Sequence, residues 1–390
     1  MTEILYIASM FDDADLGTIF SNPENVSYAA SKYNRLLCEG LAQNGVRVEA
    51  LALLPVTRSN CKKILVRKKP EKSGDLTVRY MTTVNLPVIK HILRCIYSFF
   101  RVLFAERGTV VLFDLFAVSA NIGMNAAAKI RRFERVCIIT DMPEHLTSSK
   151  MCLRIENKLI ADATAYVLLT EQMKERVVSG RKKAIVLEGH IDHNAARTED
   201  DAADARDPSQ RIVLYAGALH RRYGIADLVD AFRACHKQGE VLHIYGTGDY
   251  AEKIKEIARE DPCIRYFGVK PNGFIVQAER EADLLVNPRT GEGEYTKFSF
   301  PSKVLEYMVS GTPVLMARLP GIPDEYYDYV YIFDDRKKDG LARALRAVLD
   351  TDVSETADMG RRARNFVLRC KSNVTQAEKI IALLRHDEKD

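Results

Sequence analysis

Short apolar runs alternate with helix-type patterns along the whole chain, and this alternation constrains the fold more than any other feature. In the first half, buried-strand patterns occur at 4–9, 46–53, 109–115, 135–140 and 164–170. In the second half, they occur at 211–219, 240–246, 263–268, 282–288, 313–317 and 329–333. Strands that alternate with helices form parallel sheets covered by helices. The sequence therefore predicts an α/β protein.

A polar stretch divides the chain of 390 residues almost evenly. Residues 196–210 are rich in alanine and aspartate and have no apolar face, which is typical of a linker. We expect one Rossmann-like domain at 1–195 and a second at 211–372. The helical pattern at 373–390 either closes the second domain or crosses back to the first.

The net charge is only +4, but it is unevenly spread. Residues 51–140 hold 16 Lys or Arg and 5 Asp or Glu. Such an excess indicates an anionic partner: a membrane surface, a lipid phosphate or a nucleic acid. Nucleic acid is the weakest of the three, because the basic stretch has few interleaved aromatic residues for base stacking. We expect no nucleic-acid partner.

The eight cysteines include no CxxC pair and no zinc-type spacing with histidine. A reduced, cytoplasmic chain without a structural metal is the simplest interpretation. The start of the chain resembles a strand rather than a signal peptide. No apolar run reaches the roughly 18 residues that a spanning helix needs. We therefore expect a cytoplasmic protein, with any membrane contact peripheral and on the inner face.

The stretch FPSKVLEYMVSGTPVL (300–315) predicts a helix with a functional first turn. Pro301 suits the first helical position, and Ser302 and Lys303 then present backbone N–H groups that no helical carbonyl accepts. Such a helix start binds phosphate. Glu306 lies one turn further on the same face, where it can accept both hydroxyls of a ribose. Together these features indicate a nucleoside diphosphate. The alternative is that Glu306 simply pairs with Lys303.

Other polar residues follow the predicted strands of the second half. Arg221 and Arg222 come after 211–219, and Gly246 begins a Gly-Thr-Gly-Asp turn after 240–246. Ligands of parallel α/β sheets bind beyond the carboxyl ends of the strands, so these residues are binding candidates. Solvated loop charges and an ordinary turn are the alternatives.

The second half resembles the GT-B glycosyltransferases, specifically the retaining group called family 4 or group 1. The resemblance rests on YAGALHRRYGI, LHIYGTGD, RYFGV and FPSKVLEYMVSGTPVL, in that order. It implies a GT-B fold, with two Rossmann-like domains facing across a cleft. The nucleotide-sugar donor would bind the second domain and the acceptor the first.

The resemblance also implies a role for each donor-site residue. Glu306 would bind the donor ribose, and the main chain near Gly268 and Val269 would read the base. The N–H groups of the helix start would bind the diphosphate, which arginine would neutralise. The full donor set is Glu306, Ser302, Lys303, Arg221, Arg222, Gly268, Val269 and Gly246. Arg222 is also expected to act in catalysis, by stabilising the departing diphosphate.

Three positions depart from the family pattern. Phe298 stands where a second glutamate is common, and Tyr223 stands where lysine is usual. A glycine pair after the first strand is missing, and only Gly17 is nearby. These departures leave the contacts to the donor sugar unassigned.

The first half offers Asp141, which follows the strand pattern at 135–140. It is the candidate catalytic residue near the transferred sugar, and the alternative is a turn residue. Asp13-Ala-Asp15 resembles a metal-binding DxD but follows the first strand, so we interpret it as a polar loop. We expect no metal and no cofactor, because the nucleotide sugar is a substrate.

The helix predicted at 86–105 carries Lys90, Arg94 and Arg101 on one face and apolar residues on the rest. Such a helix either lies in a membrane interface, attracted by anionic lipid, or packs in the core. We expect the membrane contact.

The sequence thus predicts a retaining, metal-independent glycosyltransferase that uses a nucleotide-diphosphate sugar, with UDP favoured. The expected acceptor is a lipid-linked saccharide or polyprenyl pyrophosphate in cell-surface polysaccharide assembly. A sugar-nucleotide epimerase of the same fold and a non-catalytic scaffold that binds nucleotide sugars are the alternatives. The sequence assigns no oligomeric state.

Overall fold

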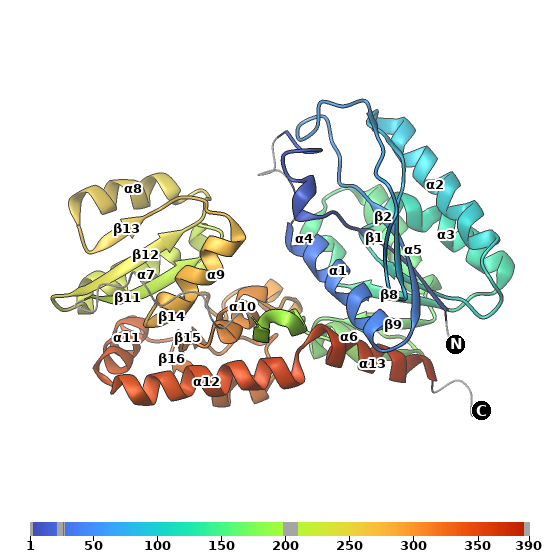
Figure 1. Ribbon diagram of the computed structural model, residues 1–390. Helices are drawn as coiled ribbons and strands as arrows, with labels where there is room; N and C mark the ends of the chain where they lie inside the picture. Colours follow the sequence, from blue (N-terminus) through green and yellow to red (C-terminus); the bar gives the residue numbers. More distant parts are fainter. Residues whose placement is uncertain (1–2, 22–25, 27, 198–209, 386–390) are drawn as a thin grey trace. The chain divides into compact units, whose positions relative to one another are not determined.

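The computed structural model describes residues 3–21, 26, 28–197 and 210–385 (Figure 1). The chain divides into two compact units. Unit 1 comprises Met1–His190 and Asn373–Asp390, and unit 2 comprises Ile191–Ser372. Most of the predicted linker, 198–209, lies outside the described residues. No helix in the described part of the chain is long and apolar enough to cross a membrane.

Unit 1 is built on an eight-stranded sheet with the order β10-β9-β8-β7-β1-β2-β5-β4. Only β4 runs antiparallel to its neighbour. The strands are β1 (Glu3–Ser9), β2 (Arg47–Leu53), β4 (Glu71–Ser73), β5 (Leu76–Tyr80), β7 (Val110–Asp114), β8 (Arg135–Ile139), β9 (Ala165–Leu168) and β10 (Lys183–Val186). The central strands are apolar and buried, as expected for strands covered on both faces.

Helices connect these parallel strands. They are α1 (Tyr28–Gln43), α2 (Pro87–Leu103), α3 (Val118–Arg131), α4 (Pro143–Leu146), α5 (Lys150–Asp162) and α6 (Glu171–Val177). The last helix, α13 (Asn373–Arg385), packs on α1 and belongs to unit 1. At Gly40 a Cβ would lie 2.2 Å from the carbonyl oxygen of Asn373, so the backbones of α1 and α13 touch.

Unit 2 is built on a six-stranded, fully parallel sheet with the order β13-β12-β11-β14-β15-β16. The strands are β11 (Arg211–Ala216), β12 (Glu240–Tyr245), β13 (Ile264–Tyr266), β14 (Leu284–Asn287), β15 (Val314–Ala317) and β16 (Tyr331–Phe333). The helices are α7 (Ile225–Cys235), α8 (Ala251–Glu260), α9 (Asn272–Glu281), α10 (Ser302–Ser310), α11 (Gly340–Asp350) and α12 (Val353–Cys370). The strand order reverses between β11 and β14, which is the doubly wound Rossmann arrangement.

The expected strands are all present, but two details differ from the sequence-based expectation. Strand β10 was not predicted, because it begins with a lysine and all four of its residues are only half-buried at the sheet edge. The alternating pattern of residues 64–81 around a Gly-containing turn predicts a hairpin over that whole range, but the hairpin is shorter and consists of β4 and β5. The preceding β3 (Leu65–Val66) pairs instead with β6 (Thr83–Val84).

Candidate functional site

The candidate site lies at the carboxyl edge of the unit 2 sheet, where β11 and β14 are neighbours. After β11 the chain continues to β12 on one side of the pair, and after β14 it continues to β15 on the other side. Ligands of such folds bind at this point, which is called the topological switch point. The loops at 217–224 and 288–301 follow β11 and β14 directly. The first loop carries Arg221 and Arg222, and the second leads into α10, which carries Ser302, Lys303 and Glu306.

Glycines hold the loops at this edge in close contact. At Gly224 a Cβ would lie 2.1 Å from the carbonyl oxygen of Pro288, which joins the loop after β11 to the loop after β14. At Gly246 a Cβ would lie 1.8 Å from the carbonyl oxygen of Gly217, and its φ of +127° also favours glycine. Any side chain at Gly224 or Gly246 would therefore separate these loops.

The second turn of helix α10 is bonded to the end of β11. The hydroxyl of Tyr307 accepts a hydrogen bond from the N–H of Ala216 at 2.8 Å and donates to its carbonyl at 3.2 Å. At the helix start, the carbonyl of Pro301 accepts the N–H of Val304 at 2.9 Å, and no side chain caps the first turn. The N–H groups of the first turn are therefore held near the switch point without a side-chain cap.

Glu306 and Lys303 form an ion pair near the start of α10, as predicted by the alternative in which Glu306 simply pairs with Lys303. Lys303 Nζ lies 2.7 Å from Glu306 Oε2 and 3.6 Å from Oε1 of Glu279 on α9. Burial lowers the pKa of Lys303, but the two carboxylates outweigh it and raise the pKa overall. The ammonium therefore stays charged and offsets part of the negative charge beside the helix start.

Arg221 and Arg222 lie in the short 3-10 turn η4 (Arg221–Tyr223), and both side chains are exposed. The Arg221 guanidinium lies over the Tyr250 ring at 4.8 Å, and that of Arg222 over the Tyr223 ring at 4.9 Å. Among the described residues, neither forms a salt bridge with a carboxylate. Two exposed arginines that are supported by rings and form no direct salt bridge in the described part of the chain can bind a phosphate.

Arg289, which follows β14, is a site residue that the sequence-based reasoning missed. Its Nη2 donates to Ser299 Oγ at 2.6 Å, and its guanidinium lies 4.9 Å from the ring of Tyr295. It also lies 5.7 Å from the ring of Tyr223, so it extends the cationic cluster of η4 across the switch point. Nearby, Asn287 is buried, and its Nδ2 has no hydrogen-bond partner among the described residues. The signal was present in the sequence, as an arginine two residues after a buried strand.

The remaining donor-site candidates lie on neighbouring loops of the same edge. Gly268 has a φ of +68°, and its carbonyl accepts the N–H of Gly246 at 2.8 Å. The carbonyl of Gly246 in turn accepts the hydroxyl of Tyr266 at 2.9 Å. Val269 is 63% exposed. Phe298, at the position of the missing second glutamate, is buried in the core of unit 2.

Asp141 lies in unit 1, whereas the other candidates lie in unit 2. It stands two residues after β8, just before α4, and it is half-buried. The structure therefore places Asp141 at a strand end, as the sequence indicated. Asp141 belongs to a different unit from the other candidates.

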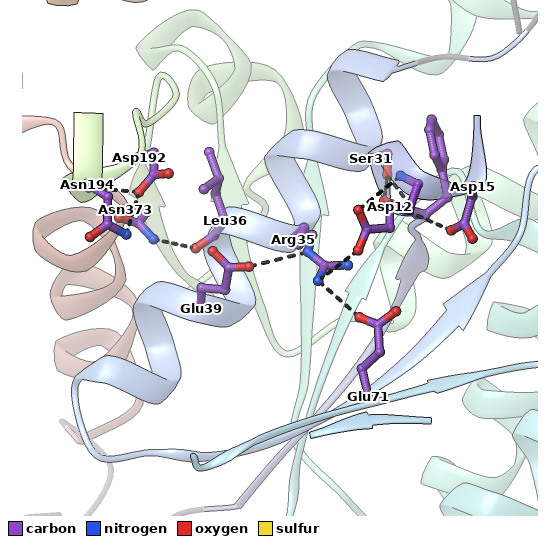
Figure 2. A network of polar contacts seen from close by, with 12 residues as sticks. Asp12, Asp15, Ser31, Arg35, Leu36, Glu39, Glu71, Asp192, Asn194 and Asn373 are labelled. Atoms are coloured by element: carbon purple, nitrogen blue, oxygen red, sulfur yellow. Dashed lines mark hydrogen bonds and ion pairs between the residues drawn. The ribbon is translucent and has the colours of Figure 1, made fainter. Parts of the chain in front are cut away.

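Asp15, the second aspartate of the Asp13-Ala-Asp15 stretch, belongs with Asp12 to a polar network in unit 1 (Figure 2). Asp15 is buried, accepts the N–H of Asp12 at 2.8 Å and pairs with Lys68 at 2.6 Å. Arg35 joins Asp12 to Glu71 on β4, at 3.5 and 3.0 Å. Asp15 thus ties the loop after β1 to the segment that precedes β4. Within the described ranges, no group of three or more His, Cys, Asp or Glu has the arrangement of a metal site.

Residues 210–351 match the family described as Glycosyl transferases group 1. Curated protein sequences gave no match.

Solved structures match over the whole chain. HepE from Anabaena, in complex with UDP, is 14% identical with a TM-score of 0.63, covering 99% of this chain and 100% of HepE. Sucrose-phosphate synthase from Thermosynechococcus elongatus is 17% identical with a TM-score of 0.65, covering 100% and 99% of the two chains. An E. coli trehalose-6-phosphate structure bound with UDP-2-fluoro glucose is 11% identical with a TM-score of 0.68, covering 98% and 99%. The chain therefore has the expected GT-B fold of two Rossmann-like domains, and its second unit carries the match to the group 1 glycosyl transferases.

Proposed function

We propose that the protein is a retaining glycosyltransferase that uses a nucleotide-diphosphate sugar, most readily a UDP-sugar, as its donor. One observation carries the proposal. Glu306 lies one turn inside α10, and the next residue, Tyr307, bonds that helix to the end of β11. A phosphate-binding helix start with a carboxylate one turn further fits a nucleoside diphosphate. The match of residues 210–351 to the group 1 glycosyl transferases supports this assignment.

The donor would bind unit 2 through its diphosphate and its ribose. The N–H groups of Ser302 and Lys303 would bind the diphosphate, together with the guanidinium groups of Arg222 and Arg289. Glu306 would accept the ribose hydroxyls. The Lys303 ammonium, 2.7 Å from that carboxylate, would reduce its repulsion toward the phosphates. Arg221 and the main chain of Gly246 and of Gly268–Val269 would complete the donor site.

The reaction breaks the bond between the anomeric carbon and the diphosphate oxygen. The acceptor hydroxyl oxygen bonds to the anomeric carbon from the side of the leaving group, and its proton passes to a diphosphate oxygen. The contribution of the protein is chiefly electrostatic, because arginine and helix N–H groups stabilise the charge that develops on the diphosphate. We propose that this step needs no metal. Asp141 of unit 1 is assigned to the acceptor side.

The proposed acceptor is a lipid-linked saccharide or polyprenyl pyrophosphate in cell-surface polysaccharide assembly. A lipid-borne acceptor brings the protein to the inner face of the cell membrane, where residues 86–105 would make a peripheral contact. The basic excess of residues 51–140 and the exposed apolar side chains of α2 support this location.

Incubation with a panel of UDP-sugars, with and without a polyprenyl pyrophosphate-linked acceptor, tests the proposal. We expect slow release of UDP without acceptor and faster release with it. Tight binding without any release of UDP would indicate the scaffold, and interconversion of two UDP-sugars would indicate the epimerase. Thermal shifts with nucleotides of different bases would identify the base.

A further inference from the structure

Helix α2 of unit 1 has its basic side chains on its inner face. Lys90 Nζ donates to the carbonyl of Val56 at 3.0 Å, and Arg94 Nη2 donates to that of Leu54 at 2.6 Å. Arg101 Nε pairs with Glu49 on β2 at 2.8 Å. These three cations were expected to contact anionic lipid, and the structure shows that this expectation was wrong. Their long side chains bond instead to main-chain carbonyls that follow β2 and to Glu49 on β2 itself.

The apolar side chains of α2 point outward. Ser98 and Val102 are fully buried and Arg94 is 8% exposed, whereas eight large apolar residues between Val88 and Phe104 are 39% to 74% exposed. The outer face, as we call it, includes Val88, Ile89, Ile92, Ile96, Phe100 and Phe104. A helix on a soluble domain normally buries its apolar stripe, so this arrangement is inverted. Contiguous exposed apolar patches of this kind mark interaction sites.

The packing of α2 against α3 explains the inversion. At Gly123 of α3 a Cβ would lie 1.9 Å from the carbonyl oxygen of Cys95 in α2. Ser98 Oγ also donates to the carbonyl of Ala120 at 2.6 Å. The two helices, which lie side by side in Figure 1, therefore approach backbone to backbone. No space remains between them for large side chains, so the apolar residues of α2 lie on the opposite side.

A groove of about 690 Å³ adjoins the outer face. Met81, just after β5, lines it together with Ile96, Phe100 and Phe104, and the buried Arg94 also lines it. Arg94 Nε has no hydrogen-bond partner among the described residues, and burial lowers the pKa of Arg94 to about 10. An apolar groove with an uncompensated cation fits the hydrocarbon chain and anionic headgroup of a lipid.

Exposed cations border the helix start. The N–H of Asn85, just before α2, donates to the carbonyl of Ile64, which places the segment 62–69 at that end. Lys62, Arg67 and Lys69 of this segment are exposed, as are the apolar side chains of Ile64 and Leu65. The apolar surface thus continues into a basic border. Anionic lipid headgroups attract such a border, and the hydrocarbon chains of the lipids accept the apolar residues.

We propose that the outer face of α2 docks on an anionic phospholipid bilayer, with a lipid chain entering the groove beside Met81 and Phe100. A second copy of the chain is a poorer occupant, because α2 carries no acidic side chain that could pair with the basic border of the other copy. The inference deepens the membrane contact of the proposed function, but its evidence comes from α2 and its neighbours alone.

Sedimentation with phosphatidylcholine vesicles, with and without phosphatidylglycerol, tests this proposal without donor or acceptor. The wild-type chain should bind the anionic vesicles, and added salt should weaken the binding. The double variant Ile96→Ser/Phe100→Ser should lose at least about tenfold in affinity, because two exposed side chains can no longer be buried in lipid. The matched control is Met151→Ser/Val353→Ser, which changes two exposed apolar residues elsewhere and should bind like wild type.

Equal binding to both vesicle types, or full binding by Ile96→Ser/Phe100→Ser, would overturn the proposal. A wild-type dimer that this double variant converts to a monomer would also overturn it, in favour of a second copy on the face. All changed residues are exposed, so melting temperature and UDP binding should stay unchanged. Failure of vesicle binding is therefore distinguishable from failure of the donor site.

Discussion

The Tyr307 hydroxyl bonds both main-chain groups of Ala216, at 2.8 Å to the N–H and at 3.2 Å to the carbonyl. Tyr307 lies on α10, and Ala216 is the last residue of β11. One buried side chain in the second turn therefore bonds α10 to the strand end where the donor is proposed to bind. The position of the proposed phosphate-binding helix start depends on this contact.

Tyr307→Phe should lower the free energy of unfolding by about 1–3 kcal/mol, because it leaves buried main-chain groups of Ala216 unpaired. UDP affinity should fall as well, since the helix start is no longer held in place. Tyr331→Phe is the matched control, because the Tyr331 hydroxyl is buried without a partner among the described residues. Urea unfolding and calorimetry measure both effects. Equal stability of the two variants would contradict this role of Tyr307.

Arg222→Ala and Arg289→Ala should each weaken UDP binding by about tenfold and uridine binding much less. Hydrogen bonds to charged groups contribute about 1.5–3 kcal/mol, and only UDP carries the phosphates. Arg233→Ala, on α7 and paired with Asp261, is the control and should change neither affinity. If uridine and UDP lose affinity equally, the residues that bind the diphosphate lie elsewhere.

Stability should fall as the pH is lowered from about 6.5 to about 4. Burial, together with nearby Arg265, lowers the pKa of His243 to about 4, and burial likewise lowers the pKa of His190 to about 4. The unfolded state, with a histidine pKa of about 6.5, binds more protons in this window. Each histidine then contributes a slope of up to about 1.4 kcal/mol per pH unit, and above pH 6.5 the contribution is complete.

The variant His243→Phe separates this effect from other titrations. Among the described residues, His243 Nε2 has no hydrogen-bond partner, so the change removes a proton site without breaking a bond there. Urea unfolding at a series of pH values should show a shallower loss of stability between pH 6.5 and pH 4. An unchanged slope would show that His243 does not stay neutral in the folded protein.

Turnover of the UDP-sugar should survive addition of a chelator, because the proposed stabilisation of the diphosphate comes from arginine and helix N–H groups. Asp15→Asn should lower stability, since Asp15 pairs with Lys68 at 2.6 Å, and should leave UDP affinity unchanged. Turnover that absolutely requires manganese, and that Asp15→Asn abolishes, would contradict this account. Such a result would make the loop after β1 a metal site.

The sequence predicted most of the fold because buried parallel strands are apolar along their whole length. It placed the start of α10 within one residue for the same kind of local reason: Pro301, expected at the first helical position, is the N-cap of a helix that begins at Ser302, and Gly311 follows its end. Arg289 was missed for a different reason. Its place at the site depends on β14 lying beside β11, and this neighbour relationship is a property of the sheet order.

Helix α2 shows a second limit of the sequence. The periodicity correctly placed Lys90, Arg94 and Arg101 on one face, but it does not tell which face is buried. That choice depends on the partner helix, where Gly123 allows only a close backbone contact. The basic face consequently turned inward and the apolar face outward.

Calorimetric titration of Glu306→Ala with UDP tests the central claim most directly. Lys303 retains Glu279 at 3.6 Å in this variant, so α10 should stay folded and the melting temperature should be close to that of wild type. Glu256→Ala, on the exposed side of α8, is the control and should bind UDP like wild type. The account predicts that Glu306→Ala loses at least about tenfold in UDP affinity through the lost ribose hydrogen bonds. Unchanged UDP affinity in a folded Glu306→Ala protein would contradict it.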